Sequence, residues 1–156
     1  MKITSQFIEV ALARYFNYRI NIIVPNVHWG LGLSYECDLV IVTSSGYATE
    51  IEIKTSKQDI KNDFKKASYA HHSKLFKRFF YAVPEKLKDC DLLPADCGLL
   101  TVDNNMRCKL IRSPRINKNS RKLTSKEIAK LLHLGCMRIW SLKNIIEGNR
   151  RNECEN

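Results

Sequence analysis

Two neighbouring apolar segments, residues 37–43 and 47–54, constrain the fold of this chain most strongly. Both have the composition of buried β-strands, and the Ser-Ser-Gly between them suits a three-residue hairpin loop closed by Gly46 in the left-handed region. Such a loop pairs Thr43 with Tyr47. The sequence therefore predicts an antiparallel hairpin of fixed register, and the register fixes the face on which each side chain lies.

This register gathers acidic side chains on one face. Counting back from the loop places Asp38 opposite Glu52 and Glu36 opposite Lys54, with all four on the same face and Cys37 on the other. Directly opposed side chains stand about 5 Å apart at Cβ, so two facing carboxylates repel each other. A divalent cation between Asp38 and Glu52 would offset the repulsion. Mg²⁺ suits the position because it takes one or two protein carboxylates and keeps several waters.

Two acids and a lysine are sufficient for phosphodiester hydrolysis. A bound Mg²⁺ lowers the pKa of a water and neutralises charge that develops on the phosphorus oxygens. Lys54 can orient that water or stabilise the pentacoordinate state. A single E-x-K triplet more often marks a solvated strand face. Here the second acid at a compatible register, the apolar opposite face and the capped helix that follows favour the catalytic interpretation.

The remaining pattern predicts one α/β domain. Helices are indicated over residues 6–18, 57–70 and 124–146, the last with a break at Gly135 as an alternative, and the last two begin with the capping patterns S-x-x-D and T-x-x-E. Strands are indicated within residues 21–36 and over 37–43, 47–54, 78–84, 97–103 and 107–113. We expect residues 1–147 to form a single domain, a central mixed sheet flanked by helices, and residues 148–156 to be a disordered tail.

The charge balance points to a polyanionic partner. The chain has 26 Lys and Arg against 16 Asp and Glu, a formal net charge of +10, and nucleic acid is the commonest polyanion. Lys57, Lys61 and Lys65, on the helix after the hairpin, are candidates for phosphate contacts, and Trp29 for stacking on a base. The alternatives are a solvated helix face and a core tryptophan. Residues 113–122, basic and without an acid, predict an exposed linker.

Targeting and redox signals are few. No apolar run of about 18 residues and no secretory pattern occurs, so we expect a cytoplasmic protein without membrane association. No two of the six cysteines have C-x-x-C spacing, which favours reduced thiols over a metal site or a disulfide framework.

Asp38 and the Glu52-Ile53-Lys54 triplet resemble the signature of the PD-(D/E)XK nuclease superfamily, which has the restriction-endonuclease-like fold. That signature is an acid on one core strand, E/D-x-K on the next, and then a helix. Here 13 residues separate Asp38 from Glu52, and Cys37 replaces the variable proline of the motif. The stretches VPNVHWGLGLSYECDL, SGYATEIEIKTSKQDIKNDFKK and GCMRIWSLKN also resemble a small uncharacterised phage and bacterial family of stand-alone nuclease-fold domains.

The resemblance implies Asp38, Glu52 and Lys54 as the catalytic set, with Mg²⁺, or Mn²⁺ as a substitute, held by the two acids. Superfamily members often add an acid from the first helix, here Glu9, although a polar residue on an amphipathic helix explains Glu9 equally well. Glu36 is a further candidate, as a metal ligand or as a partner of Lys54.

The resemblance therefore implies a metal-dependent deoxyribonuclease that acts in phage or bacterial DNA repair, recombination or processing, in the cytoplasm of a bacterial cell or a phage-infected host. RNA is an alternative substrate, and the sequence leaves open whether cutting is internal or from ends. A homodimer is expected if both strands are cut at one site. Two rival hypotheses are a nucleic-acid-binding protein that keeps the fold without cutting, and a protein whose basic face docks on an acidic partner.

Overall fold

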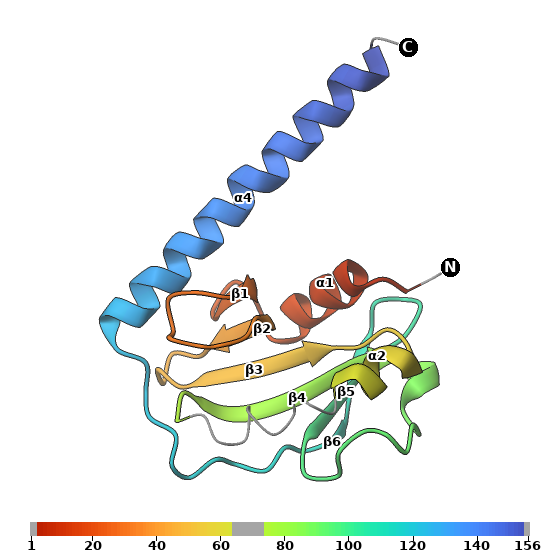
Figure 1. Cartoon of the computed structure of the whole chain (residues 1–156), viewed down its shortest axis with the longest axis vertical. Coiled ribbons are helices and arrows are strands. Elements are labelled where there is room, and N and C mark those ends of the chain that lie inside the picture. The colour runs from red at the N-terminus through yellow and green to blue at the C-terminus, as the bar shows by residue number, and fades with distance from the viewer. Residues whose placement is uncertain (1–2, 64–73, 155–156) are drawn as a thin grey trace.

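A computed structural model describes residues 3–63 and 74–154. Its elements in chain order are α1 (Ser5–Tyr15), β1 (Ile22–Val27), β2 (Cys37–Val42), β3 (Ala48–Ile53), α2 (Lys57–Asp63), β4 (Phe76–Pro84), the 3-10 helix η1 (Glu85–Leu87), β5 (Gly98–Val102), β6 (Cys108–Arg112) and α4 (Ser125–Cys154). The fold is α/β, a six-stranded mixed sheet with flanking helices, which confirms the expected class (Figure 1).

Strand order in the sheet follows chain order from β1 to β6. β1, β2 and β3 pair antiparallel, β3, β4 and β5 pair parallel, and β6 returns antiparallel to β5. Because β3 and β4 are parallel neighbours, their carboxyl ends lie at the same edge of the sheet. The Lys54 N–H extends that pairing by donating to the Ala82 carbonyl at 3.0 Å. The residues that follow both strands therefore emerge side by side.

Each face of the sheet buries a different set of side chains. Ile51 and Ile53 of β3 pack with Ile8 and Leu12 of α1 on one face. The other face holds two separate apolar clusters, one under the first turns of α4 near β1 and β2, the other under α2 and the segment after η1. Glu50 and Glu52 point to this second face, as the alternation of side chains predicted.

The β2–β3 hairpin has the predicted register. Val40 pairs with Glu50 and Val42 with Ala48. At the loop, the Thr43 N–H donates to the Tyr47 carbonyl at 3.3 Å and the Gly46 N–H to the Thr43 carbonyl at 2.8 Å. Gly46 has φ +81°, the left-handed conformation that favours glycine in a three-residue loop.

Helix α4 is longer than expected. A disordered tail was expected from residue 148, whereas the helix continues to Cys154. Its first turns pack on the sheet through Leu131 and Leu134, and its second half projects beyond the sheet (Figure 1). That half exposes Ile139, Trp140, Leu142, Ile145 and Ile146. Within the described ranges, no helix combines the length and apolar character needed to cross a bilayer.

The start of α4 is a complete capping box. The Glu127 N–H donates to the Thr124 hydroxyl at 3.2 Å, while the Thr124 N–H donates to the Glu127 carboxylate at 2.8 Å. The Arg121 guanidinium contacts the same carboxylate through both terminal nitrogens, at 2.6 and 2.8 Å. Its bonds, helped by Thr124 and opposed by partial burial, lower the pKa of Glu127 to about 2.

We expect Glu127→Gln to lower the free energy of unfolding by about 1 kcal/mol at neutral pH, because glutamine can keep the capping bond but loses the ion pair with Arg121. The pKa of Glu127 is lower in the folded than in the unfolded chain. Its stabilisation is therefore present above the unfolded value of 4.5 and is lost as pH falls towards 2. Urea unfolding followed by circular dichroism at several pH values tests this. A stability difference that does not narrow with acid would contradict it.

Candidate active site

The hairpin opens at the end away from its loop. β2 and β3 pair regularly as far as Leu39 and Ile51. One step further, the Asp38 carboxylate accepts the Ile53 N–H at 2.7 Å, where a bond to the main chain of β2 would otherwise form. The side chain of Asp38 thus fills the gap between the separating strands, and one of its oxygens is held by the backbone of β3.

Lys54 stands beside both predicted metal ligands. Its ammonium nitrogen lies 2.8 Å from Glu52 Oε2 and 3.9 Å from Asp38 Oδ2. The side chains of Lys54 and Glu52 are 10% and 9% exposed, whereas that of Asp38 is 33% exposed. The structure therefore brings the three predicted catalytic residues together, with Asp38 the most open to solvent.

A hollow of about 500 Å³ adjoins this cluster. Asp38, Ile53 and Lys54 line it from the sheet edge. Its other lining residues come from the start of α1, from α2 and from the loop between β3 and α2: Ser5, Thr55, Asp59 and Asn62. A substrate group can therefore reach the Asp38 carboxylate and the end of β3 from solvent.

Glu50 lies one pleat behind Glu52 and is completely buried, with 0% exposure. The Tyr35 hydroxyl lies 3.0 Å from its Oε2 and the Cys37 thiol 3.4 Å from its Oε1. Burial raises the pKa of Glu50 to about 8, and the charge of Glu52 adds to the effect. Cys37 was expected on the opposite face, with Leu39. Its contact with Glu50 shows that strict alternation fails at the start of β2.

The two additional acids have different surroundings. Glu9, on α1, is partly buried; burial raises its pKa, and the nearby charge of Asp38 raises it further. Glu9 thus lies close enough to Asp38 to interact with it. The structure does not bring Glu36 to Lys54: Glu36 is half exposed, 3.9 Å from His28. Regular pairing stops at Asp38, so the register no longer places Glu36 opposite Lys54.

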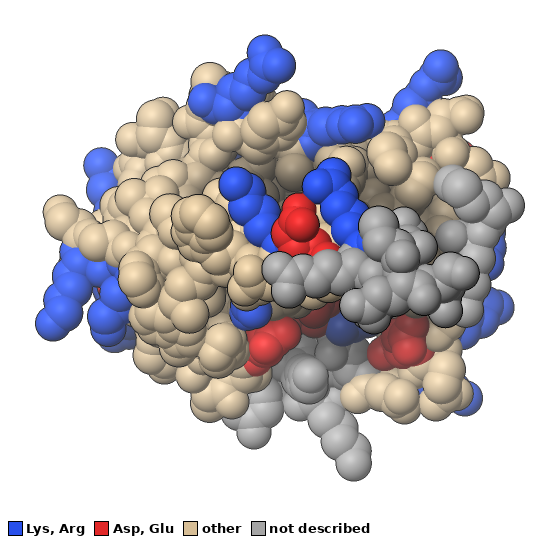
Figure 2. All heavy atoms as spheres, turned by 90° about the horizontal axis from the view of Figure 1, so that it is seen from above, with Lys and Arg blue, Asp and Glu red and all other residues tan. Residues whose placement is uncertain are grey.

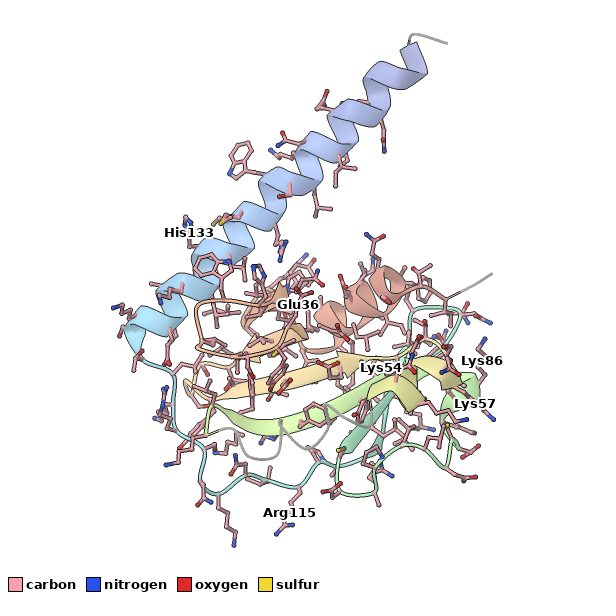
Figure 3. The ribbon with its side chains drawn as sticks, viewed as in Figure 1. Glu36, Lys54, Lys57, Lys86, Arg115 and His133 are labelled. Carbon is pink, nitrogen blue, oxygen red and sulfur yellow. The ribbon has the colours of Figure 1, made fainter. Side chains whose placement is uncertain are left out.

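The predicted nucleic-acid contacts lie in separate places. Lys57 and Lys61 are exposed on α2, while Lys65 falls outside the described residues. Lys57 lies near the same edge as Lys54 and Lys86 in Figure 3, consistent with the parallel ends of β3 and β4. Trp29 packs against the cluster beneath α4, its ring edge-on to His133 at 6.2 Å between centroids.

Sequence reasoning missed two parts of the site. The Tyr35 and Cys37 contacts depend on how the loop before β2 folds over Glu50, and no spacing rule signals that. Asp59 was predicted only as part of the S-x-x-D capping pattern, and Ser56 does cap α2, because the Asp59 N–H donates to Ser56 Oγ at 3.1 Å. Its position on the hollow follows from the packing of α2 against β4, which involves Ile60.

The donors present fit a magnesium ion that keeps most of its waters. No group of three or more His, Cys, Asp and Glu side chains suited to a metal occurs among the described residues. Asp38 and Glu52 nevertheless face one cation already, the Lys54 ammonium, so their position favours positive charge. One or two carboxylates are the usual protein share of a Mg²⁺ site.

A comparison with known protein families shows to which family this chain belongs. The family model described as "DNA repair protein MmcB-like" matches residues 9–143, most of the chain and all three of Asp38, Glu52 and Lys54. The chain belongs to the MmcB-like family. No curated protein matches this MmcB-like sequence.

A solved structure has a similar fold. It is the SPO1766 protein of unknown function from Silicibacter pomeroyi, with a TM-score of 0.66 and 20% sequence identity over 96% of each chain. At that identity the likeness concerns the fold. It indicates that this MmcB-like chain shares its architecture over nearly its full length.

The buried Glu50 makes a testable contribution to stability. Its folded pKa of about 8 exceeds the unfolded value of 4.5, so its protonated form is favoured by folding. The contribution of Glu50 to the free energy of unfolding is therefore fully present below pH 4.5 and is lost as pH rises through 8. We expect Glu50→Gln, measured in EDTA, to raise the melting temperature at pH 8 by at least about 2 °C, with little change at pH 4.5. An equal shift at both pH values would contradict this.

Proposed function

We propose that the protein is a metal-dependent nuclease of the PD-(D/E)XK type that hydrolyses DNA phosphodiester bonds during DNA repair. The observation that carries the proposal is the Lys54 ammonium lying 2.8 Å from the Glu52 carboxylate and 3.9 Å from that of Asp38, at a sheet edge that adjoins an open hollow. A purely DNA-binding surface has no need of two carboxylates there, because they repel phosphate.

Each residue has a role that its surroundings support. Asp38, the most exposed of the three, is the ligand that a metal ion reaches first from the hollow. Glu52 is nearly buried and paired with Lys54, so it would hold its position as the second ligand. When Mg²⁺ or Mn²⁺ binds there, it supplies charge neutralisation at the phosphate and lowers the pKa of a water.

Lys54 would act on the water or on the phosphate. Once a metal ion balances the two carboxylates, its ammonium group is available to orient the attacking water or to stabilise negative charge on the phosphorus oxygens. Its backbone N–H bond to Ala82 fixes the start of the side chain, so the ammonium can move only through side-chain rotation. Glu9, on α1, would adjust the charge around Asp38, because the charges of the two carboxyl groups interact.

Family and charge support DNA as the substrate. The family is named for DNA repair, and the net charge of +10 favours binding to a polyanion. Figure 2 shows Lys and Arg side chains projecting on several sides of the molecule. The spacing Asp38…Glu52-Ile53-Lys54, followed by the capped helix α2, matches the PD-(D/E)XK signature.

The test is cleavage of linear, nicked, branched and single-stranded DNA with Mg²⁺, Mn²⁺ or EDTA. We expect cutting only with metal. Lys54→Ala and Asp38→Asn should each reduce the rate about a hundredfold to a thousandfold, since each removes a group that stabilises transition-state charge. Lys109→Ala, an exposed lysine on β6, is the control and should cut like the wild type.

Two outcomes would contradict the proposal. Cutting that survives in both Lys54→Ala and Asp38→Asn would mean that another site, or a contaminant, is responsible. Binding of DNA by the wild type without cutting under any metal would favour the rival hypothesis, a nucleic-acid-binding protein that keeps the fold without catalysis.

A further inference from the structure

A second hollow, of about 510 Å³, lies between the start of β4 and the basic segment 113–122. It is separate from the hollow at Asp38 and shares no lining residue with it. Four of its described lining residues are cations: Lys77, Arg78, Arg115 and Lys118. One carboxylate, Asp96, also lines it. The surface is therefore concave and strongly positive.

Backbone hydrogen bonds hold the two walls of this hollow together. The Asn117 N–H donates to the Lys77 carbonyl at 3.0 Å, and the Asn117 side-chain amide donates to the Phe76 carbonyl at 3.1 Å. The Arg121 N–H donates to the Lys74 carbonyl at 2.8 Å. The backbone of residues 113–122, expected to be an exposed linker, is thus fixed against β4, which fixes where its cationic side chains begin.

One of the four cations, Lys77, is also oriented by an aromatic ring. The Lys77 ammonium stands over the Tyr47 ring, 3.6 Å from its centroid, which directs the side chain along the surface. Arg115 and Lys118 are exposed, and Figure 3 shows Arg115 pointing away from the sheet. A solvated charge run would spread its charges over a convex surface. Here segments far apart in sequence bring like charges together around a hollow, at a cost that a bound polyanion would offset.

We infer that this basic hollow, defined by Lys77, Arg78, Arg115 and Lys118, binds the phosphate backbone of the DNA substrate away from the cut. The inference rests on the proposed nuclease function for the identity of its ligand. Phosphate contacts of this kind position a duplex without reading its sequence. The hollow therefore supplies affinity and register, while the Asp38 site supplies the chemistry.

The strand β4 gives the spacing between the two sites. Ala82 lies beside Lys54, and Arg78 precedes Ala82 by four residues along the same strand. Four residues of a strand rise about 13 Å, which is the length of about four base pairs of B-DNA. We therefore expect the substrate to need about that much duplex on one side of the cut.

The first test is the salt dependence of DNA binding in EDTA, where no cutting interferes. The double variant Arg115→Gln/Lys118→Gln should lower the slope of log K against log salt by about 2, because each lost phosphate contact removes about 0.9. The affinity lost between about 50 and 200 mM salt should then shrink about tenfold. The matched control, Lys126→Gln/Lys130→Gln on α4, removes the same charge from exposed lysines and should leave the slope unchanged.

The second test is cleavage of duplexes trimmed towards the mapped cut. We expect the double variant to be impaired on long duplexes, and to match the wild type once fewer than about four base pairs remain on the side that crosses the hollow. Equal impairment on duplexes trimmed from either side would overturn this placement.

The outcomes separate this inference from the proposed function. An unchanged slope in the double variant, or an equal loss in the α4 control, would overturn the DNA-binding role of the hollow even if the wild type cuts. If the double variant lowers the slope of log K against log salt but the wild type cuts no DNA, the DNA-binding role of the hollow is supported and the proposed nuclease activity is overturned.

Discussion

The contact of the Lys54 ammonium with two carboxylates is what allows acidic side chains to meet at the end of the hairpin. Glu52 and Lys54 are nearly buried, and desolvating either charge alone would be costly. The Asp38 carboxylate lies beside them because it accepts the Ile53 N–H, and this bond replaces the regular pairing of β2 with β3. The same three side chains that contact one another here are those proposed to share a metal ion and a phosphate.

Strand β3 supports that cluster by its burial. All six of its residues are buried, and Ile51 and Ile53 lock one face against α1. On the other face Glu50 lies between two apolar clusters, where Tyr35 and Cys37 hold its carboxyl group. A strand fixed on both faces leaves Glu52 and Lys54 little freedom. Rigid placement of charged groups is what electrostatic catalysis requires.

Much of this arrangement could be predicted from the sequence, because short-range rules determine it. The Ser-Ser-Gly loop sets the hairpin register, and strand alternation then places Glu52 and Lys54 together. The rules fail where pairing ends: Glu36 meets His28, and Cys37 turns to Glu50. The basic hollow could not be predicted either, because backbone hydrogen bonds between residues 74–77 and 117–121 create it and no local sequence pattern encodes those bonds.

The most direct test of the account is the position of a bound metal. Crystals soaked in Mn²⁺ should show an anomalous scattering peak between the carboxylates of Asp38 and Glu52, with the Lys54 ammonium displaced from one of them. The same soak of Asp38→Asn crystals should lose the peak. A wild-type structure with no peak there, or with Mn²⁺ bound only elsewhere, would contradict the claim that this hairpin end is a metal-dependent catalytic centre.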